Sequence, residues 1–132
     1  MVHTKPEFLM GKKWIIIAGI SGFLGVALGA FGAHGLRNTL PAEMIEIYKT
    51  GVLYQLIHSA VLLTLALAAG KSFEISGWFF VAGIVLFSFS LYLYSVTGTT
   101  FFAIITPFGG MCFLAGWLSL IWIAVKKKTQ KE

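Results

Sequence analysis

The sequence GISGFLGVALGAFGAHG, residues 19–35, places six of the chain's fifteen glycines inside an otherwise apolar stretch. In a helix surrounded by water, each interior glycine costs about 1 kcal/mol relative to alanine, so this stretch would make a poor soluble helix. Inside a lipid bilayer the backbone has to satisfy its own hydrogen bonds, and small residues allow a second helix to approach closely. The stretch therefore predicts a membrane-spanning helix that packs tightly against another helix.

The composition of the whole chain supports a membrane protein. Hydrophobic residues make up 58% of the 132 residues and charged residues only 11%, a balance outside the range of soluble domains. Four apolar stretches are long enough to cross the hydrocarbon core, for which a helix needs about 20 residues. They cover residues 14–33, 52–69, 77–96 and 104–125. We expect an all-α integral membrane protein with one domain, 14–125, built as an up-down bundle of four transmembrane helices.

The charges lie at the ends of the predicted spans and indicate their orientation. A basic leader, 1–13, precedes the first span and a basic tail, 126–132, follows the last, whereas the connection between the third and fourth spans carries no charge. Since lysine and arginine are enriched on the cytoplasmic side, both termini are expected in the cytoplasm. This distribution of the net charge of +5 favours contact with anionic lipid head groups and argues against nucleic acid as a partner.

The connections between the spans carry recognisable turn signals. Thr39 followed by Pro41 is typical of a helix start, with the threonine as cap and the proline in the first turn. We therefore expect the second helix to begin near Pro41, before the membrane. Residues 97–106 are expected to form a loop, with Pro107 opening the fourth span.

Small residues form one stripe on the first span and another on the fourth. Both stripes have the same 3-4-3 spacing, which places their members on one helix face and is typical of closely packed helices. The members are Gly22, Gly25, Gly29 and Gly32 on the first span, and Gly109, Cys112, Gly116 and Ser119 on the fourth. We expect the first span to pack against the fourth and, by oligomerisation, against another copy. The rival hypothesis is a substrate groove lined by glycine backbone.

Polar side chains inside the spans form a candidate layer at similar depth in the membrane. Its members are Tyr54, Gln55 and His58 on the second span, Ser88 and Tyr92 on the third, and Cys112 on the fourth. An ionisable residue inside a membrane is a candidate functional residue, although a neutral histidine can also serve only as a hydrogen-bonding group. Two interpretations stay open: a structural hydrogen-bonded layer, or a site that binds a ligand or handles protons.

His34 is a second candidate, at the end of the first span. A rise of 1.5 Å per residue places it about 12 Å from the level of His58, too far for one metal ion to join them. It either bonds to backbone or water at the helix end, or folds back if the helix stops near Gly32. We expect no metal site and no catalytic residues: no aspartate or glutamate lies inside the spans, and the chain has no HExxH, CxxC or phosphate-binding loop.

Three motifs together resemble a known family. They are GVALGAFGAHGL at residues 25–36, YQLIH at 54–58 and TPFGGMCFLAGW at 106–117. As a set they are similar to the small four-span membrane proteins of the domain-of-unknown-function 423 family, the YgdD-like proteins, over residues 14–125. The resemblance implies a four-helix protein of the bacterial inner membrane with no established activity. It also implies that His34 and His58 match family positions, whereas Gln55 replaces a histidine that is common there, which argues against a metal at that position.

Three function classes remain compatible with the sequence. The favoured one is a non-enzymatic structural or accessory protein that acts through helix packing and through contacts with lipid, with itself or with other membrane proteins. The second is a protein that binds a small molecule or cofactor, such as haem, a quinone, a metal or a lipid, through His58 and neighbouring tyrosines. The third is an oligomeric transporter or channel. The sequence leaves the identity of any cofactor unknown.

Overall fold

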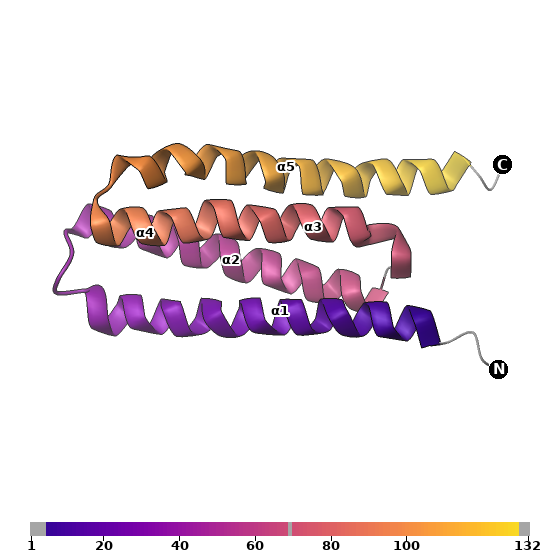
Figure 1. The fold of residues 1–132 in the computed structure, drawn as a ribbon, viewed down its shortest axis with the longest axis horizontal. Helices are drawn as coiled ribbons and strands as arrows, with labels where there is room; N and C mark the ends of the chain where they lie inside the picture. The colour runs from indigo at the N-terminus through magenta and orange to yellow at the C-terminus, as the bar shows by residue number, and fades with distance from the viewer. Residues whose placement is uncertain (1–4, 69, 130–132) are drawn as a thin grey trace.

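The structure, a computed structural model, describes residues 5–68 and 70–129 and is helical almost throughout (Figure 1). The ends of the expected leader and tail, 1–4 and 130–132, lie outside the described residues. Its elements are α1 (Lys5–Phe31), the π-helical turn η1 (Gly32–Leu36), α2 (Ala42–Ala68), the 3₁₀ turn η2 (Gly70–Phe73), α3 (Glu74–Gly83), the π-helical turn η3 (Ile84–Ser88), α4 (Phe89–Thr97) and α5 (Thr100–Thr129).

Four helical segments are long and apolar enough to cross a membrane, which confirms the predicted fold class. They are Gly11–Leu36, Ala42–Ala68, Glu74–Thr97 and Thr100–Lys127. The third segment is α3, η3 and α4 in succession, and each segment runs opposite to the one before it (Figure 1). Helix α1 consequently begins, and α5 ends, at the same end of the molecule, which we call the lysine end because Lys12, Lys13, Lys126 and Lys127 lie there.

The connection before α2 differs from the prediction in its cap. The Thr39 hydroxyl donates to the carbonyl of Leu36 at 3.1 Å, so it closes the end of the preceding turn and does not cap α2. The carbonyl of Pro41 instead accepts the first bond of α2, from the Ile45 N–H at 3.1 Å. The expected start near Pro41 is therefore right, but the assignment of Thr39 as its cap is wrong. A hydroxyl can donate to an exposed helix-end carbonyl as readily as it can accept from a first-turn N–H.

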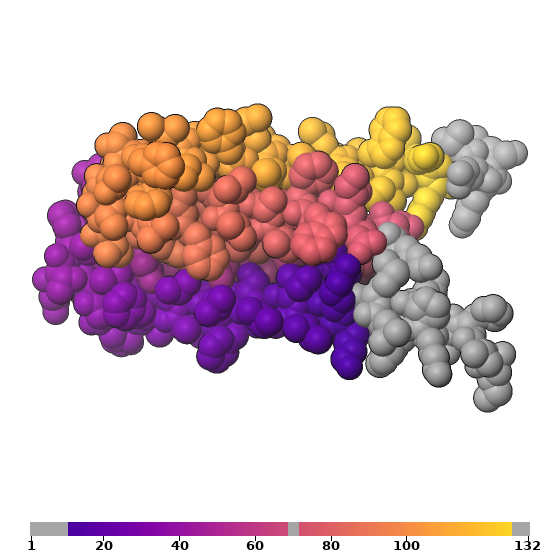
Figure 2. All heavy atoms as spheres, in the orientation of Figure 1, coloured from indigo at the N-terminus to yellow at the C-terminus, as the bar shows by residue number. Residues whose placement is uncertain are grey.

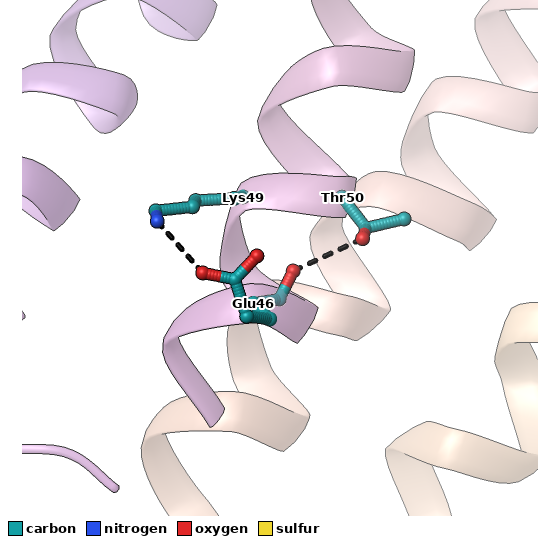
Figure 3. A network of polar contacts seen from close by, with 3 residues as sticks. All are labelled: Glu46, Lys49 and Thr50. Carbon is teal, nitrogen blue, oxygen red and sulfur yellow. Dashed lines mark hydrogen bonds and ion pairs between the residues drawn. The ribbon is translucent and has the colours of Figure 1, made fainter. Parts of the chain in front are cut away.

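The first turns of α2 carry charges that neutralise each other at the surface (Figure 3). Lys49 Nζ donates to Glu46 Oε1 at 2.7 Å, and the Thr50 hydroxyl donates to the Glu46 carbonyl at 3.0 Å. Both charged side chains are largely exposed. The helix continues without a break from this polar turn into its apolar part. The polar first turns of α2 and its apolar span are therefore one element.

The predicted loop over residues 97–106 is wrong, because only Gly98 and Thr99 separate α4 from α5. Gly98 adopts the left-handed conformation with φ of 66°, and its N–H donates to the Tyr94 carbonyl at 2.8 Å, which ends α4 in the manner typical of glycine. Pro107 consequently lies inside α5. Membrane helices tolerate an interior proline because neighbouring groups can compensate for the lost backbone bond.

The four spans form an open array in which each packs mainly on its neighbours in the chain. Helix α1 packs on α2, α2 packs on η3 and α4, and α5 packs along α3, η3 and α4, whereas α1 and α5 share no extensive contact. In the orientation shared by Figures 1 and 2, the two lie at opposite edges of the molecule. The buried share of the apolar window is 17% for both outer spans but 28% and 39% for the inner two. The expectation that the first span packs against the fourth is therefore wrong.

The glycine stripe of α1 receives side chains from α2. A Cβ atom on Gly25 would lie 2.7 Å from Leu56 Cδ2, and one on Gly32 would lie 2.5 Å from Tyr48 Cε1. Distances this short leave no room for a methyl group unless the neighbour moves. The stripe thus has the close-packing role predicted for it, but its partner is the next helix in the chain.

The stripe of α5 packs on the third span and comes closest to it at Gly109. A Cβ atom there would lie 2.6 Å from the carbonyl carbon of Leu86 and 2.7 Å from Phe87 Cα, both in the π-helical turn η3. Two helical turns further along, a Cβ atom on Gly116 would lie 2.6 Å from Phe80 Cε1. The sequence did not predict η3. Its position shows that α5 and the third span meet backbone to backbone where the helix is locally widened.

The first prediction concerns this backbone contact. Gly109→Ala should lower the free energy of unfolding by about 1–3 kcal/mol, because the added methyl group meets backbone atoms that cannot rotate away. The matched control is Gly110→Ala, whose Cβ would lie 3.8 Å from the nearest atom, Phe87 Cδ2. Thermal unfolding in detergent measures both variants. Equal midpoints for the two alanine variants would contradict the packing at Gly109.

Candidate functional site

The expected polar layer is divided between two sides of α2. Gln55 faces α1 and α4 through its bonds to Ser21 and Tyr92, whereas His58 faces α5 through a bond to Trp117. Both side chains are buried, with exposed fractions of 0% and 4%. The structure therefore contains two separate polar clusters, and we describe each in turn.

The Gln55 cluster consists of Ser21, Gln55, Ser59 and Tyr92. The Gln55 amide donates through Nε2 to the Ser21 carbonyl at 2.9 Å and accepts through Oε1 from the Tyr92 hydroxyl at 2.7 Å. The Ser59 hydroxyl lies 2.7 Å from Ser21 Oγ and 2.6 Å from the Gln55 carbonyl oxygen. These bonds connect three spans. Since an unpaired polar group in hydrocarbon costs several kcal/mol, the mutual pairing holds α1, α2 and α4 in one arrangement.

Tyr48 extends the Gln55 cluster towards the end of the molecule opposite the lysine end. Its hydroxyl donates to the Leu28 carbonyl of α1 at 2.7 Å, and its ring lies 4.9 Å from that of Tyr92 between centroids. Tyr92 in turn covers Gly51, where a Cβ atom would lie 2.8 Å from its ring. Tyr48 and Tyr92 therefore combine ring packing with hydrogen bonding at the junction of α1, α2 and α4.

The His58 cluster consists of Tyr54, His58, Phe113 and Trp117. His58 Nδ1 lies 2.7 Å from the Tyr54 carbonyl oxygen, and Trp117 Nε1 donates to His58 Nε2 at 3.3 Å. The ring stacks on Phe113 with 3.7 Å between centroids and 11° between planes. A carbonyl can only accept and an indole N–H can only donate. The two contacts therefore fix the neutral tautomer with the proton on Nδ1.

A groove of about 400 Å³ opens beside the His58 cluster, between α2 and α5. Its lining is aromatic and apolar: Tyr54, His58, Phe87, Pro107, Gly110, Met111, Phe113, Leu114 and Trp117. Both nitrogens of His58 are occupied within the protein, so a metal or haem iron would have to displace the Trp117 contact or change the tautomer. Among the described residues, no group of three histidine, cysteine, aspartate or glutamate side chains is placed to hold a metal ion.

Two members of the expected layer and the second candidate, His34, lie outside both clusters. Ser88 is fully buried at the end of η3, and its hydroxyl has no hydrogen-bond partner within the part of the chain that the structure describes. Cys112 is a half-buried free thiol on α5. His34 is exposed in η1, so it neither folds back nor approaches His58. The predicted layer therefore does not include Ser88 or Cys112, whereas His34 lies at the helix end, one of the two positions expected for it.

The main residue that the candidate layer lacked is Trp117, the partner of His58. An indole on the fourth span is typical of the membrane interface, so no sequence pattern pairs Trp117 with a histidine. Ser21 was also missed, because one of its two hydrogen bonds in the Gln55 cluster is made by its backbone carbonyl, which any residue type carries. A serine beside glycines on the first span was the only signal that could have identified it.

Comparisons with known proteins agree on one family. Residues 28–110 match the family model described as "Protein of unknown function (DUF423)". The UPF0382 membrane protein YwdK of Bacillus subtilis strain 168 is 42% identical over 120 residues, which cover 87% of this chain and 98% of the relative. The UPF0382 inner membrane protein YgdD of Escherichia coli K12 is 42% identical over 126 residues, which cover 91% and 95%. No solved structure matches the chain.

The second prediction concerns the Gln55 cluster. Tyr92→Phe should lower the free energy of unfolding by about 1–3 kcal/mol, because it leaves the buried Gln55 amide oxygen without its donor. Tyr94→Phe is the control, since the Tyr94 hydroxyl makes no hydrogen bond to the described residues. In a double-mutant cycle, the same substitution in a Gln55→Leu background should cost less. Full additivity of the two substitutions would contradict the assigned bond.

Proposed function

Since the chain belongs to the DUF423 family, as its glycine-rich motifs predicted, we propose a function from its own geometry. The protein is a non-enzymatic accessory component of the bacterial inner membrane, as the name of its Escherichia coli relative, an inner membrane protein, suggests. It acts through the outer faces of α1 and α5, which contact lipid and other membrane proteins. The lysine end faces the cytoplasm, in keeping with the enrichment of lysine on that side.

The open array of helices is the observation that carries this proposal. Because α1 and α5 do not close on each other, each keeps a long apolar face that the chain itself does not cover. Phe23 on α1 is 73% exposed, and Leu114 on α5 is 65% exposed. In lipid such faces need no cover, but they are also the surfaces through which membrane helices associate.

The interior supports the proposal because its polar groups are engaged in holding the fold. The Gln55 amide and both His58 nitrogens have partners within the protein, so they are not free to bind a substrate. A general acid or base has to reach the proton that it transfers. The three described carboxylate side chains nearest the spans, Glu43, Glu46 and Glu74, lie at the helix ends, away from either cluster.

The two other function classes receive less support from the geometry. Binding of haem or a metal through His58 requires that its bond to Trp117 be broken. A transporter or channel needs an enclosed path, whereas the grooves of this array open towards its surroundings. A purely apolar guest in the groove beside His58 remains compatible with the geometry and is distinguished by the experiment below.

The third prediction tests the accessory role. Membranes that contain the protein are solubilised with a polymer that cuts out native lipid discs, and the discs are analysed by native mass spectrometry. We expect discs in which the chain is accompanied by a second membrane protein or by another copy. Leu114→Ala with Leu118→Ala should reduce this association if α5 provides the contact, and Phe23→Ala should reduce it if α1 does.

Two results would contradict the accessory role. Discs that always contain one copy of the chain and no other protein would overturn the accessory role. A bound small molecule that is lost in His58→Phe, with unchanged thermal stability, would instead favour the binding function.

A further inference from the structure

The pocket at the lysine end of α5 combines positive charge with a position at the membrane surface. It has a volume of about 340 Å³ and is lined by Ser72 of η2 and by Trp122, Ile123, Lys126 and Lys127 of α5. We propose that this pocket binds the phosphate group of an anionic phospholipid such as phosphatidylglycerol. The site needs no protein partner, so its test is independent of the test of the proposed accessory role.

The two lysines of the pocket are available for an anion. Both are exposed, and neither forms an ion pair with any carboxylate in the described part of the chain. Glu74, which lies just after η2, is already paired with Lys13 Nζ at 2.6 Å. Two adjacent ammonium groups without a counter-charge attract a phosphate, and the Ser72 hydroxyl on the opposite wall can donate to its oxygens.

The surface that leads away from the pocket favours a lipid over a free phosphate ion. Below Trp122, the outer face of α5 continues into the membrane as an unbroken apolar surface: Leu118 and Leu114 follow at intervals of one turn, and both are about two-thirds exposed. An acyl chain can lie on this surface while its head group occupies the pocket. Tryptophan at the junction is typical of the level at which lipid head groups meet hydrocarbon, and basic pockets beside membrane helices are known to hold anionic head groups.

The chain contains a matched control for a general effect of charge. Lys12 lies at the same end, is exposed and forms no ion pair with the described residues, but it lines none of the pockets described above. Its removal lowers the net charge by the same amount as the removal of Lys126. If the two variants differ in their preference for anionic lipid, the pocket is responsible for the difference. If they lose the preference equally, only the general positive charge of this end of the molecule is responsible.

The fourth prediction is a lipid-retention measurement. The full chain is equilibrated in detergent with equal amounts of phosphatidylglycerol and phosphatidylcholine with identical acyl chains, and native mass spectrometry counts the lipids retained. We expect a preference for phosphatidylglycerol that falls about fivefold in Lys126→Gln and further in Lys126→Gln with Lys127→Gln. Lys12→Gln and the charge-preserving pair Lys126→Arg with Lys127→Arg should keep the preference. Thermal unfolding of each variant shows that it is folded.

Several outcomes would overturn the site. They are a wild-type chain without preference for phosphatidylglycerol, an unchanged preference in the double glutamine variant, and an equal loss in Lys12→Gln. In a separate arm, inorganic phosphate is compared with chloride at the same ionic strength. Binding of phosphate but not of chloride, by a chain that shows no preference for phosphatidylglycerol, would show that the pocket takes the free ion, which contradicts a lipid site.

Discussion

The close approach of helices at glycine is the interaction on which the rest of this structure depends. In lipid, apolar side chains gain little from leaving their surroundings, so helices associate where their surfaces fit closely. Each neighbouring pair of spans has such a place: Gly25 and Gly32 against α2, Gly51 against Tyr92 of α4, and Gly109 against the backbone of η3. Because these contacts join helices that follow one another in the chain, they produce an open array with α1 and α5 at its edges.

The buried polar groups lie where these contacts bring the spans together, and they add direction to the packing. Gln55 links α2 to both α1 and α4, and the bond between Trp117 and His58 links α5 to α2, a pair of helices that shares little backbone contact. A hydrogen bond that forms in just one arrangement of the helices disfavours every alternative arrangement, because its groups would then stay unpaired in hydrocarbon. The polar clusters thus select one geometry among those that small-residue packing allows. The outer faces of α1 and α5 and the lysine end are left free for contacts beyond the chain.

The sequence predicted those features that depend on a single segment. The four spans follow from the length of apolar stretches, and the packing role of Gly25 and Gly32 follows from residue size and helical spacing. Features that depend on a second segment were predicted poorly. The stripe of the first span was matched with the fourth because their spacings agree, yet spacing alone does not select a partner. His58, Cys112 and Ser88 have similar depths, but depth does not state which side of a helix each residue faces. The turn η3 and its backbone contact with Gly109 were not predicted, because no local pattern indicates either.

Disulfide cross-linking of α1 tests the order of the helices most directly. A Cβ atom on Gly22 would lie 4.0 Å from Ser59 Cβ, within the range that a disulfide requires. With Cys112 replaced by serine, Gly22→Cys combined with Ser59→Cys should form an intramolecular disulfide on oxidation in the membrane. Gly22→Cys in the presence of the native Cys112 should form none within the chain. A cross-link between residues 22 and 112, without one between 22 and 59, would mean that the first span packs against the fourth and would contradict the open array.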